Sequence, residues 1–308
     1  MTEDNFKKIS LRDFKFERTL SNDVEAKQIY LLGTMKGEDP QKKALLKMEK
    51  LAFEEKDLQN LGQQENDCLG TDQLILSENH YFQNDVYNKM FLEMNPQISK
   101  IQCDFAFPAP QSQIDKYTKQ ETLLIHETYD MYNNFVKPLF IDKLEPIQWI
   151  ENVLDGKSEL DLQLFRADDY TIKIDWKMNS EDLDTLHLLV FPYDRNLRTV
   201  RDLDQRHLQM LESIRDTTYT LIEEKYSIKK SQIRAFFHYH PTFYNMHIHF
   251  THISQTEKVG AYLGRGIFLE DVIENIKIKG DYYQTKTMAV CLGENNAIYR
   301  ILKENQQI

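Results

Sequence analysis

One stretch of the chain constrains its fold more than any other: residues 243–251, which read FYNMHIHFT. Apolar and polar side chains alternate along it, and a period of two residues is typical of a strand that buries one face. The two faces would hold Tyr244, Met246, Ile248 and Phe250 on the apolar side and Phe243, Asn245, His247, His249 and Thr251 on the other. The stretch therefore predicts a strand that packs on a core by one face and presents imidazoles on the other, with His247 at an exposed edge of the sheet.

The residues just before this strand extend the histidine-rich region. Residues 235–242, AFFHYHPT, are also strand-like, and Pro241 marks a turn between the two runs. A hairpin would carry His238 to the face that holds His247 and His249. We expect His240 and His252 to be structural or solvent-facing, because they alternate with that face.

The rest of the second half shows clear helix and strand signals. LHLLVFPYD, from Leu186, is an apolar run of strand length. Asp204 can cap a helix whose apolar residues recur at helical spacing as far as Ile222. A second amphipathic helix is expected from about Gly266 to Ile278. Helices alternate with strands, so the sequence predicts an α+β domain with an antiparallel sheet.

The first half of the chain has fewer periodic apolar patterns, so its helices and strands are harder to predict. Residues 40–66 are charged and favour a helix, and Ile101–Gln120 combines a short β-like run with two prolines. We place a domain boundary near Thr118–Thr122, which divides the chain into residues 1–120 and 121–308. The N-terminal part is too small and too charged to hold much core alone, so we expect it to pair with a second copy.

Composition and charge exclude several classes of protein. The formal net charge is −11, which argues against a broad basic face for long nucleic acid but permits a small anionic ligand in a basic pocket. No apolar run approaches the roughly 18 residues of a membrane helix, and the polar N-terminus predicts no signal peptide. Three scattered cysteines, Cys68, Cys103 and Cys291, indicate free thiols in a reducing compartment, so we expect a cytoplasmic protein.

Three interpretations of the histidine cluster remain in competition. It could be a histidine-decorated surface strand, or a metal site, although no third ligand lies at a telling spacing near the His-x-His pair. It could instead be a nucleophilic centre, in which a neutral imidazole attacks an electrophilic phosphorus and water then cleaves the phosphoramidate. We favour the third interpretation, because histidine titrates near neutrality and can act as nucleophile, proton donor and leaving group.

The stretch resembles the histidine triad, in which histidines and apolar residues alternate. Its surroundings are similar to the scavenger mRNA decapping enzymes. The similar segments are PIQWIENVLDGKSE at 146–159, IDWKMN at 174–179, LRTVRDLDQRHLQML, GRGIFLEDVIENI and, in the first half, NDVYNKM. The resemblance therefore covers nearly the whole chain.

The resemblance implies a fold, an activity and an assembly. The activity is hydrolysis of the 7-methylguanosine cap on short capped RNA fragments or cap dinucleotides, through a covalent nucleotidyl-histidine. The products are 7-methyl-GMP and a nucleoside diphosphate, or RNA with a 5′ diphosphate, and no metal or other cofactor takes part. The assembly is a homodimer with a domain-swapped N-terminal dimerisation and lid domain and a C-terminal catalytic triad domain. Whether part of the protein is nuclear is left open.

The same resemblance implies roles for individual residues. His247 is the nucleophile, His249 the third triad position and His238 an upstream supporting histidine. Asn245 stands at the first triad position, where an amide can hydrogen-bond but cannot carry a proton. The substrate-binding residues would be Trp149, Glu159 and Asp175 at the base or ribose, Lys177, Arg265 and Lys116 at the phosphates, Thr242 and Tyr244 in the hairpin loop, and Asn84 at the base in a closed state.

The proposed cap contacts make physical sense. A methylated, cationic purine gains about 0.5–2 kcal/mol from stacking on an indole such as Trp149. A carboxylate such as Glu159 can accept both guanine donors at once. The other tryptophan, Trp176, is expected on the core-facing side of its strand. Two alternatives stay open: a cap-binding protein with little turnover, because of Asn245, and a triad hydrolase of unmethylated dinucleoside polyphosphates.

Overall fold

The structure is a computed structural model that describes residues 10–54, 74–83, 88–176, 178–255, 260–261 and 263–308. The chain divides into two compact units, residues 1–120 and 121–308. Each unit has its own sheet and its own core, and each is described by itself.

The N-terminal unit is built on a four-stranded antiparallel sheet in the order β1-β2-β3-β6. Its strands are β1 (Phe14–Asp23), β2 (Gln28–Met35), β3 (Ala44–Lys50) and β6 (Ile101–Ala106). A hairpin of β4 (Ile75–Gln83) and β5 (Asn88–Met94) and the helix α3 (Gln111–Tyr117) complete the unit. Its core is small and consists of Leu20, Leu32, Leu45 and Ile114 with a few partly buried neighbours.

The prediction of a helix within residues 40–66 is wrong for its first part, because Ala44–Lys50 forms strand β3. This strand lies between β2 and β6 and pairs with both. Lys47 reaches the carboxylates of Glu49 and Asp104 at 3.0 and 3.5 Å. Pairing on both sides has overridden a helix-favouring composition, as tertiary context often does. Residues 55–66 lie outside the described residues.

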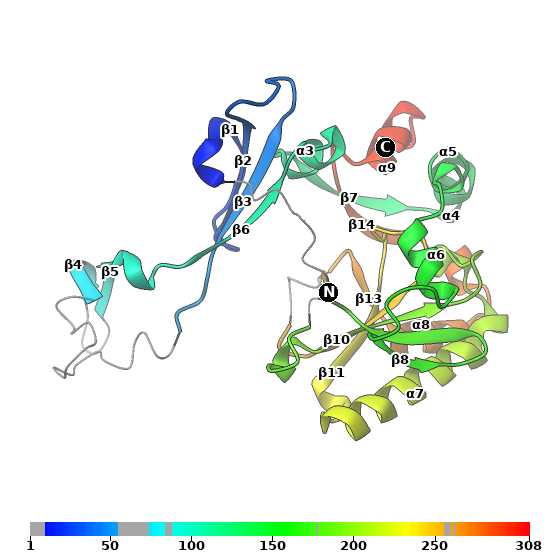
Figure 1. Ribbon diagram of the computed structural model, residues 1–308. Coiled ribbons are helices and arrows are strands. Elements are labelled where there is room, and N and C mark those ends of the chain that lie inside the picture. Colours follow the sequence, from blue (N-terminus) through cyan, green and yellow to red (C-terminus); the bar gives the residue numbers. More distant parts are fainter. Residues whose placement is uncertain (1–9, 55–73, 84–87, 177, 256–259, 262) are drawn as a thin grey trace. The chain divides into compact units, whose positions relative to one another are not determined.

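The C-terminal unit is built on a six-stranded antiparallel sheet in the order β13-β11-β12-β10-β9-β8 (Figure 1). Its strands are β8 (Gln163–Arg166), β9 (Tyr170–Ile174), β10 (His187–Pro192), β11 (Ile233–His238), β12 (Ile248–His252) and β13 (Gly266–Phe268). Strands β7 (Thr122–Glu127) and β14 (Met288–Gly293) form a separate antiparallel pair. The α-helices are α4 (Tyr129–Met131), α5 (Lys137–Leu139), α6 (Gln148–Leu154), α7 (Leu208–Tyr226), α8 (Leu269–Ile278) and α9 (Ala297–Glu304).

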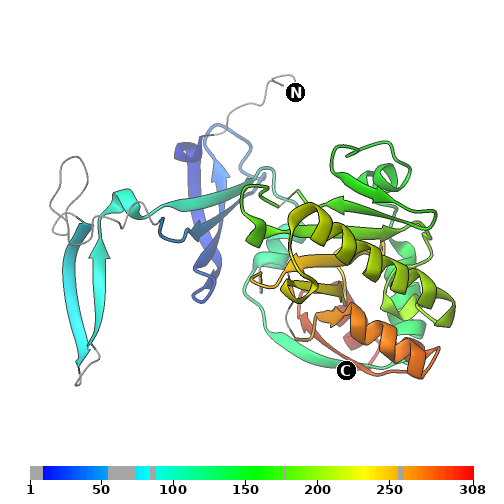
Figure 2. The same ribbon diagram turned by 90° about the horizontal axis from the view of Figure 1, so that it is seen from below.

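Helices α7 and α8 cover one face of the six-stranded sheet (Figures 1 and 2). Both predicted helices are confirmed, and Asp204 caps the short 3-10 turn that leads into α7. The second helix begins at Leu269 and not near Gly266, because Gly266–Phe268 pairs with β11 as a strand. The buried core of the unit lies between these helices and the apolar face of the sheet.

The opposite face of the sheet is covered in part by α6. Ile150 and Leu154, one turn apart, pack against Leu189 and Phe191 of β10. Every residue of β10 is therefore buried, since Leu188 and Val190 face the core on the other side. Burial on both faces explains why this strand reads as a continuous apolar run.

The predicted hairpin of β11 and β12 is confirmed, with Phe236 opposite His249. All four apolar residues of the alternating stretch are buried in the core. The expectation of an exposed edge is wrong. Strand β12 lies between β11 and β10, and His247, which precedes the strand, is only 8% exposed. The strand itself begins at Ile248, because residues 241–247 form a bent loop.

The α+β class and the antiparallel sheets are thus confirmed. Among the described residues, Cys103 and Cys291 are free and exposed. No helix in the described part of the chain combines the length and the apolar character that a membrane crossing requires.

Candidate functional site

Three histidines meet on the face of the sheet opposite α7 and α8: His238 of β11, His249 of β12 and His247, which directly precedes β12. The rings of His238 and His249 are 4.3 Å apart, and those of His247 and His249 are 4.9 Å apart. One nitrogen of each ring lies within 4.8 Å of the others. The sequence argument against a metal was the lack of a third ligand. The fold supplies one in His238, and three imidazoles are a donor set that suits Zn²⁺.

His247 has a defined tautomer. Its Nδ1–H donates to the backbone carbonyl of Asn245 at 2.8 Å, so a neutral ring carries its lone pair on Nε2. Burial lowers the pKa of His247, and Arg265 lowers it further, against the opposing effects of the Asn245 carbonyl and Asp175. A buried, neutral imidazole with a lone pair on Nε2 is a competent nucleophile.

A buried polar network anchors the loop that leads to His247. The His240 Nε2–H donates to Glu127 at 2.7 Å, and its Nδ1 lies 3.2 Å from the Tyr244 hydroxyl. Arg201 donates to the other oxygen of Glu127 at 2.9 Å. Burial alone would raise the pKa of Glu127, but His240, Arg201 and Tyr239 hold it below its usual value. His240 and His252 are both structural, as expected, since His252 bonds Ser254 at 2.7 Å.

Arg265 lies beside the histidines. Its Nη2 donates to the Thr242 hydroxyl at 3.2 Å, which joins the loop before β13 to the hairpin loop. Gly260 makes this approach possible. With φ +72°, a Cβ there would lie 2.8 Å from Nε2 of His238 and 3.3 Å from Nε of Arg265. The site therefore has a guanidinium next to its imidazoles.

Trp149 presents its indole beside this cluster. It is 38% exposed, and it packs edge-on against Phe243 and Phe191 with ring centroids 5.7 and 6.4 Å away. The His247 ring lies 5.6 Å from that same Phe191 ring. The indole of Trp149 and the imidazole of His247 thus pack on the same phenylalanine.

Two carboxylates lie on the same side of the sheet. Glu159 forms an ion pair with Lys173, whose ammonium also lies 5.9 Å from the Trp149 ring. Asp175 follows β9 and is buried, 3.9 Å from Nδ1 of His187. The indole end of the site therefore holds the Glu159–Lys173 ion pair, and the guanidinium of Arg265 lies beside the histidines.

The remaining predicted residues are Tyr244, Lys116, Asn84 and Lys177. Tyr244 is buried with its hydroxyl on His240, so it faces the core. Lys116 lies exposed on α3 of the N-terminal unit, 5.1 Å from the Tyr117 ring. Asn84 and Lys177 lie outside the described residues.

The prediction for Trp176 is wrong. Strand β9 ends at Ile174, and Trp176 is 79% exposed. Strand alternation therefore does not extend to Trp176, because the strand has ended before it.

Sequence reasoning missed two buried polar residues of this face, His187 and Lys173. The sequence could have identified Lys173, because it lies two residues before Asp175 in the strand YTIKID and so shares its face. His187 stands at the start of a wholly apolar run, where a lone histidine is unremarkable. Its Nε2 lies 2.9 Å from Nδ1 of His249.

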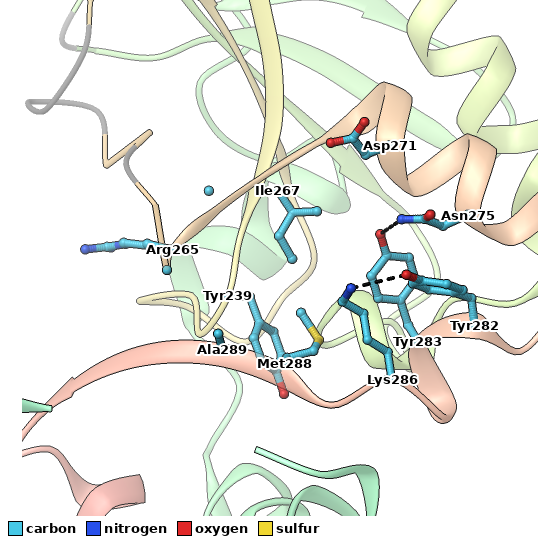
Figure 3. A pocket seen from close by; sticks show the side chains of 12 residues that line it. Tyr239, Arg265, Ile267, Asp271, Asn275, Tyr282, Tyr283, Lys286, Met288 and Ala289 are labelled. Carbon is cyan, nitrogen blue, oxygen red and sulfur yellow. Dashed lines mark hydrogen bonds between the residues drawn. The ribbon is translucent and has the colours of Figure 1, made fainter. Parts of the chain in front are cut away.

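A pocket of about 450 Å³ lies between β13, α8 and β14 (Figure 3). Lys286 donates to the Tyr282 hydroxyl at 3.2 Å, and Asn275 to the Tyr283 hydroxyl at 3.0 Å. None of the three histidines lines it. Arg265 and Tyr239 line this pocket, so it adjoins the histidine site.

Two family descriptions match the chain. Residues 9–120 match "Scavenger mRNA decapping enzyme (DcpS) N-terminal", and residues 148–261 match "Scavenger mRNA decapping enzyme C-term binding". These matches cover most of both units.

The chain is also similar to curated proteins called m7GpppX diphosphatase. The protein of Ascaris suum is 33% identical over 70% of this chain and 73% of its own length. The protein of Homo sapiens is 30% identical over 96% of this chain and 86% of its own length. The protein of Schizosaccharomyces pombe is 29% identical over 98% of both chains.

Proposed function

Because the chain belongs to the scavenger mRNA decapping enzyme family, we propose that it is an m7GpppX diphosphatase. It hydrolyses the triphosphate bridge of cap dinucleotides and short capped RNA fragments. The products are 7-methyl-GMP and a nucleoside diphosphate, or RNA with a 5′ diphosphate.

The reaction begins when Nε2 of His247 attacks the phosphorus nearest to 7-methylguanosine. The P–N bond forms as the bond to the leaving diphosphate breaks, and the Asn245 carbonyl stabilises the charge that develops on the ring through Nδ1–H. Arg265 faces the phosphate oxygens. Water then attacks phosphorus, the P–N bond breaks, and 7-methyl-GMP leaves.

The methylated base is held at the other end of the site. Trp149 offers an exposed indole face to the cationic purine, where stacking and charge act together. Glu159 accepts from the guanine N1–H and amine, and releases Lys173 as it does so. Asp175 contacts the same end of the nucleotide.

The observation that carries the proposal is the geometry of His247: neutral, with its Nδ1 committed to a carbonyl and its ring one phenylalanine away from Trp149. The direct test is incubation with m7GpppG in the presence of EDTA. We expect 7-methyl-GMP and GDP at the rate seen without EDTA. Activity that disappears on chelation and returns with Zn²⁺ would favour a metal bound by the three histidines instead.

A second candidate function rests on Asn245. With an amide at the first triad position, the chain could bind caps and turn them over slowly or not at all. The same incubation separates the two functions, because tight binding of m7GpppG without product identifies a binder.

We also propose a homodimer in which the N-terminal unit exchanges and acts as a lid. The hairpin β4–β5 supports it, since Tyr81, Phe82, Phe91 and Leu92 are all exposed large apolar residues. Light scattering should give twice the mass of the 36.7 kDa chain, and a monomeric mass contradicts the proposal.

Replacing Trp149 by alanine is expected to weaken cap binding by about 2- to 30-fold, the equivalent of the cation–π energy. The loss should be smaller for unmethylated GpppG, whose base carries no charge. Fluorescence or calorimetric titration with both ligands measures the difference. Trp149→Phe, which keeps a ring, is the matched control and should lose less. An equal loss for both ligands would mean that the indole does not read the charge.

The pH dependence of kcat/KM follows from burial of His247. The attacking ring must be neutral, and its pKa is lowered from 6.5 by burial first and by Arg265 second. A lowered pKa keeps the ring neutral further into acid, so the acid limb of kcat/KM should lie below pH 6.5. A pH series with m7GpppG measures it, and a limb at or above that value contradicts the assignment.

A further inference from the structure

His187 is the first residue of β10 and is almost fully buried on the catalytic face. Its Nε2 and Nδ1 of His249 are 2.9 Å apart. Two ring nitrogens at this distance share one proton, because one of them must donate and the other accept. The tautomer of one ring therefore determines the tautomer of the other.

Asp175 lies at the far end of this pair. Its carboxylate is 3.9 Å from Nδ1 of His187, and both side chains are buried. At the near end, the His249 ring lies 4.9 Å from the nucleophile His247. Asp175, His187, His249 and His247 thus follow one another in a series of neighbouring side chains.

Other charged groups also face the pair. Lys173 of β9 lies on the same face, because it pairs with Leu189 across from His249. His238 of β11 contacts His249 with ring centroids 4.3 Å apart. Arg265 lies beyond His238, across the position of Gly260. Two cations and one further imidazole oppose extra positive charge on the pair, and Asp175 favours it.

Asp175, His187 and His249 together can hold one extra proton. When it does, His187 carries protons on both nitrogens beside Asp175, and His249 is neutral with a proton on Nε2. If Nε2 of His249 gives up that proton, the shared proton moves to Nδ1 of His249, and His187 becomes neutral. The charge stays next to Asp175 until the moment of transfer, which avoids an isolated buried imidazolium.

We propose that His187 is a positioning residue and proton reservoir for the decapping reaction, and that it acts through His249. The inference rests on the proposed function. As the P–N bond to His247 forms and the diphosphate leaves, the leaving oxygen takes the proton from Nε2 of His249. When water attacks, its proton returns to that nitrogen. This role suits a chain in which Asn245 cannot carry a proton.

The test compares His187→Phe and His187→Gln with the wild type on m7GpppG, and follows kcat/KM against pH, cap affinity and melting temperature. Phenylalanine fills the space but removes both nitrogens. We expect kcat/KM to fall by about 10²-fold, the usual contribution of a proton donor, with unchanged cap affinity. The alkaline limb should move to lower pH, because the pair no longer holds its extra proton.

Glutamine separates proton storage from simple positioning. Its amide can still bond Nδ1 of His249 but cannot take up a proton. We expect His187→Gln to recover part of kcat/KM while its alkaline limb stays displaced. This variant also serves if His187→Phe does not fold. The ionisable groups of m7GpppG are the same in every assay. A difference between the alkaline limbs of two variants therefore reflects an ionisable group of the protein.

The outcomes are distinct. The reservoir role would be overturned if His187→Gln had the kcat/KM and the pH profile of the wild type. This outcome holds whether or not His187→Phe folds. A loss of activity that follows only the loss of melting temperature would do the same. A wild-type protein that binds cap without turnover overturns the proposed function, and this inference with it.

Discussion

Replacing His247 by asparagine is expected to abolish cap hydrolysis, with a fall in kcat of about 10⁴-fold or more, as for other enzymes that lose their nucleophile. Asparagine is close in size but has no lone pair able to attack phosphorus. Cap affinity should stay near the wild-type value, because Trp149 and Glu159 hold the base. Single-turnover assays with m7GpppG and titration with a cap analogue measure the two quantities.

His252→Asn is the matched control. His252 lies in β12, the strand that follows His247, but its Nδ1 bonds Ser254 and lies 3.3 Å from a carboxylate oxygen of Asp184, outside the site. It should retain turnover. In the wild type, rapid quenching at alkaline pH should trap 7-methyl-GMP on the peptide that contains His247, since phosphoramidates survive alkali. Turnover by the His247 variant would refute the nucleophile assignment.

Replacing Arg201 by methionine is expected to destabilise the C-terminal unit by about 3–5 kcal/mol, the cost of breaking a buried ion pair. Arg201 and Glu127 are fully buried side chains. Arg201 also donates to the carbonyls of Tyr283 and Lys286 at 2.9 and 2.7 Å. Methionine leaves the Glu127 charge with His240 and Tyr239 alone and leaves both carbonyls without this donor.

Urea unfolding followed by indole fluorescence measures this loss, because both tryptophans lie in the C-terminal unit. Arg206→Met is the control. Arg206 pairs with Asp204 in solvent, where its side chain is 82% exposed, and such pairs contribute less than about 1 kcal/mol. Equal effects of the two substitutions would mean that burial of the first pair does not matter.

The same pair predicts an acid dependence. The pKa of Glu127 is held below its ordinary 4.5 by His240, Arg201 and Tyr239, although burial opposes them. Its contribution to stability is therefore fully present above that value and is lost as the pH falls through the lower folded-state value. Unfolding titrations of the wild type and Arg201→Met at several pH values would show the difference.

The sequence alone predicted those strands and helices whose apolar residues recur with a regular period. The alternation around Met246 and Ile248 predicted which side chains enter the core, and the helical spacing after Asp204 predicted α7. The resemblance to family segments implied roles for Trp149 and Glu159, whereas strand alternation and the predicted hairpin singled out the histidines, and the structure brings Trp149 and His247 to the same phenylalanine. Periodicity works here because it acts between neighbours along the chain.

Only the tertiary structure decided which strands neighbour one another. It placed β12 inside the sheet, turned Ala44–Lys50 into a strand and left Trp176 in solvent. It also joined His187 to His249, which are 62 residues apart in the chain. The physical reason is that a period of two specifies the face of a strand but not its partners. Contacts made across strands therefore remain invisible until the sheet is assembled.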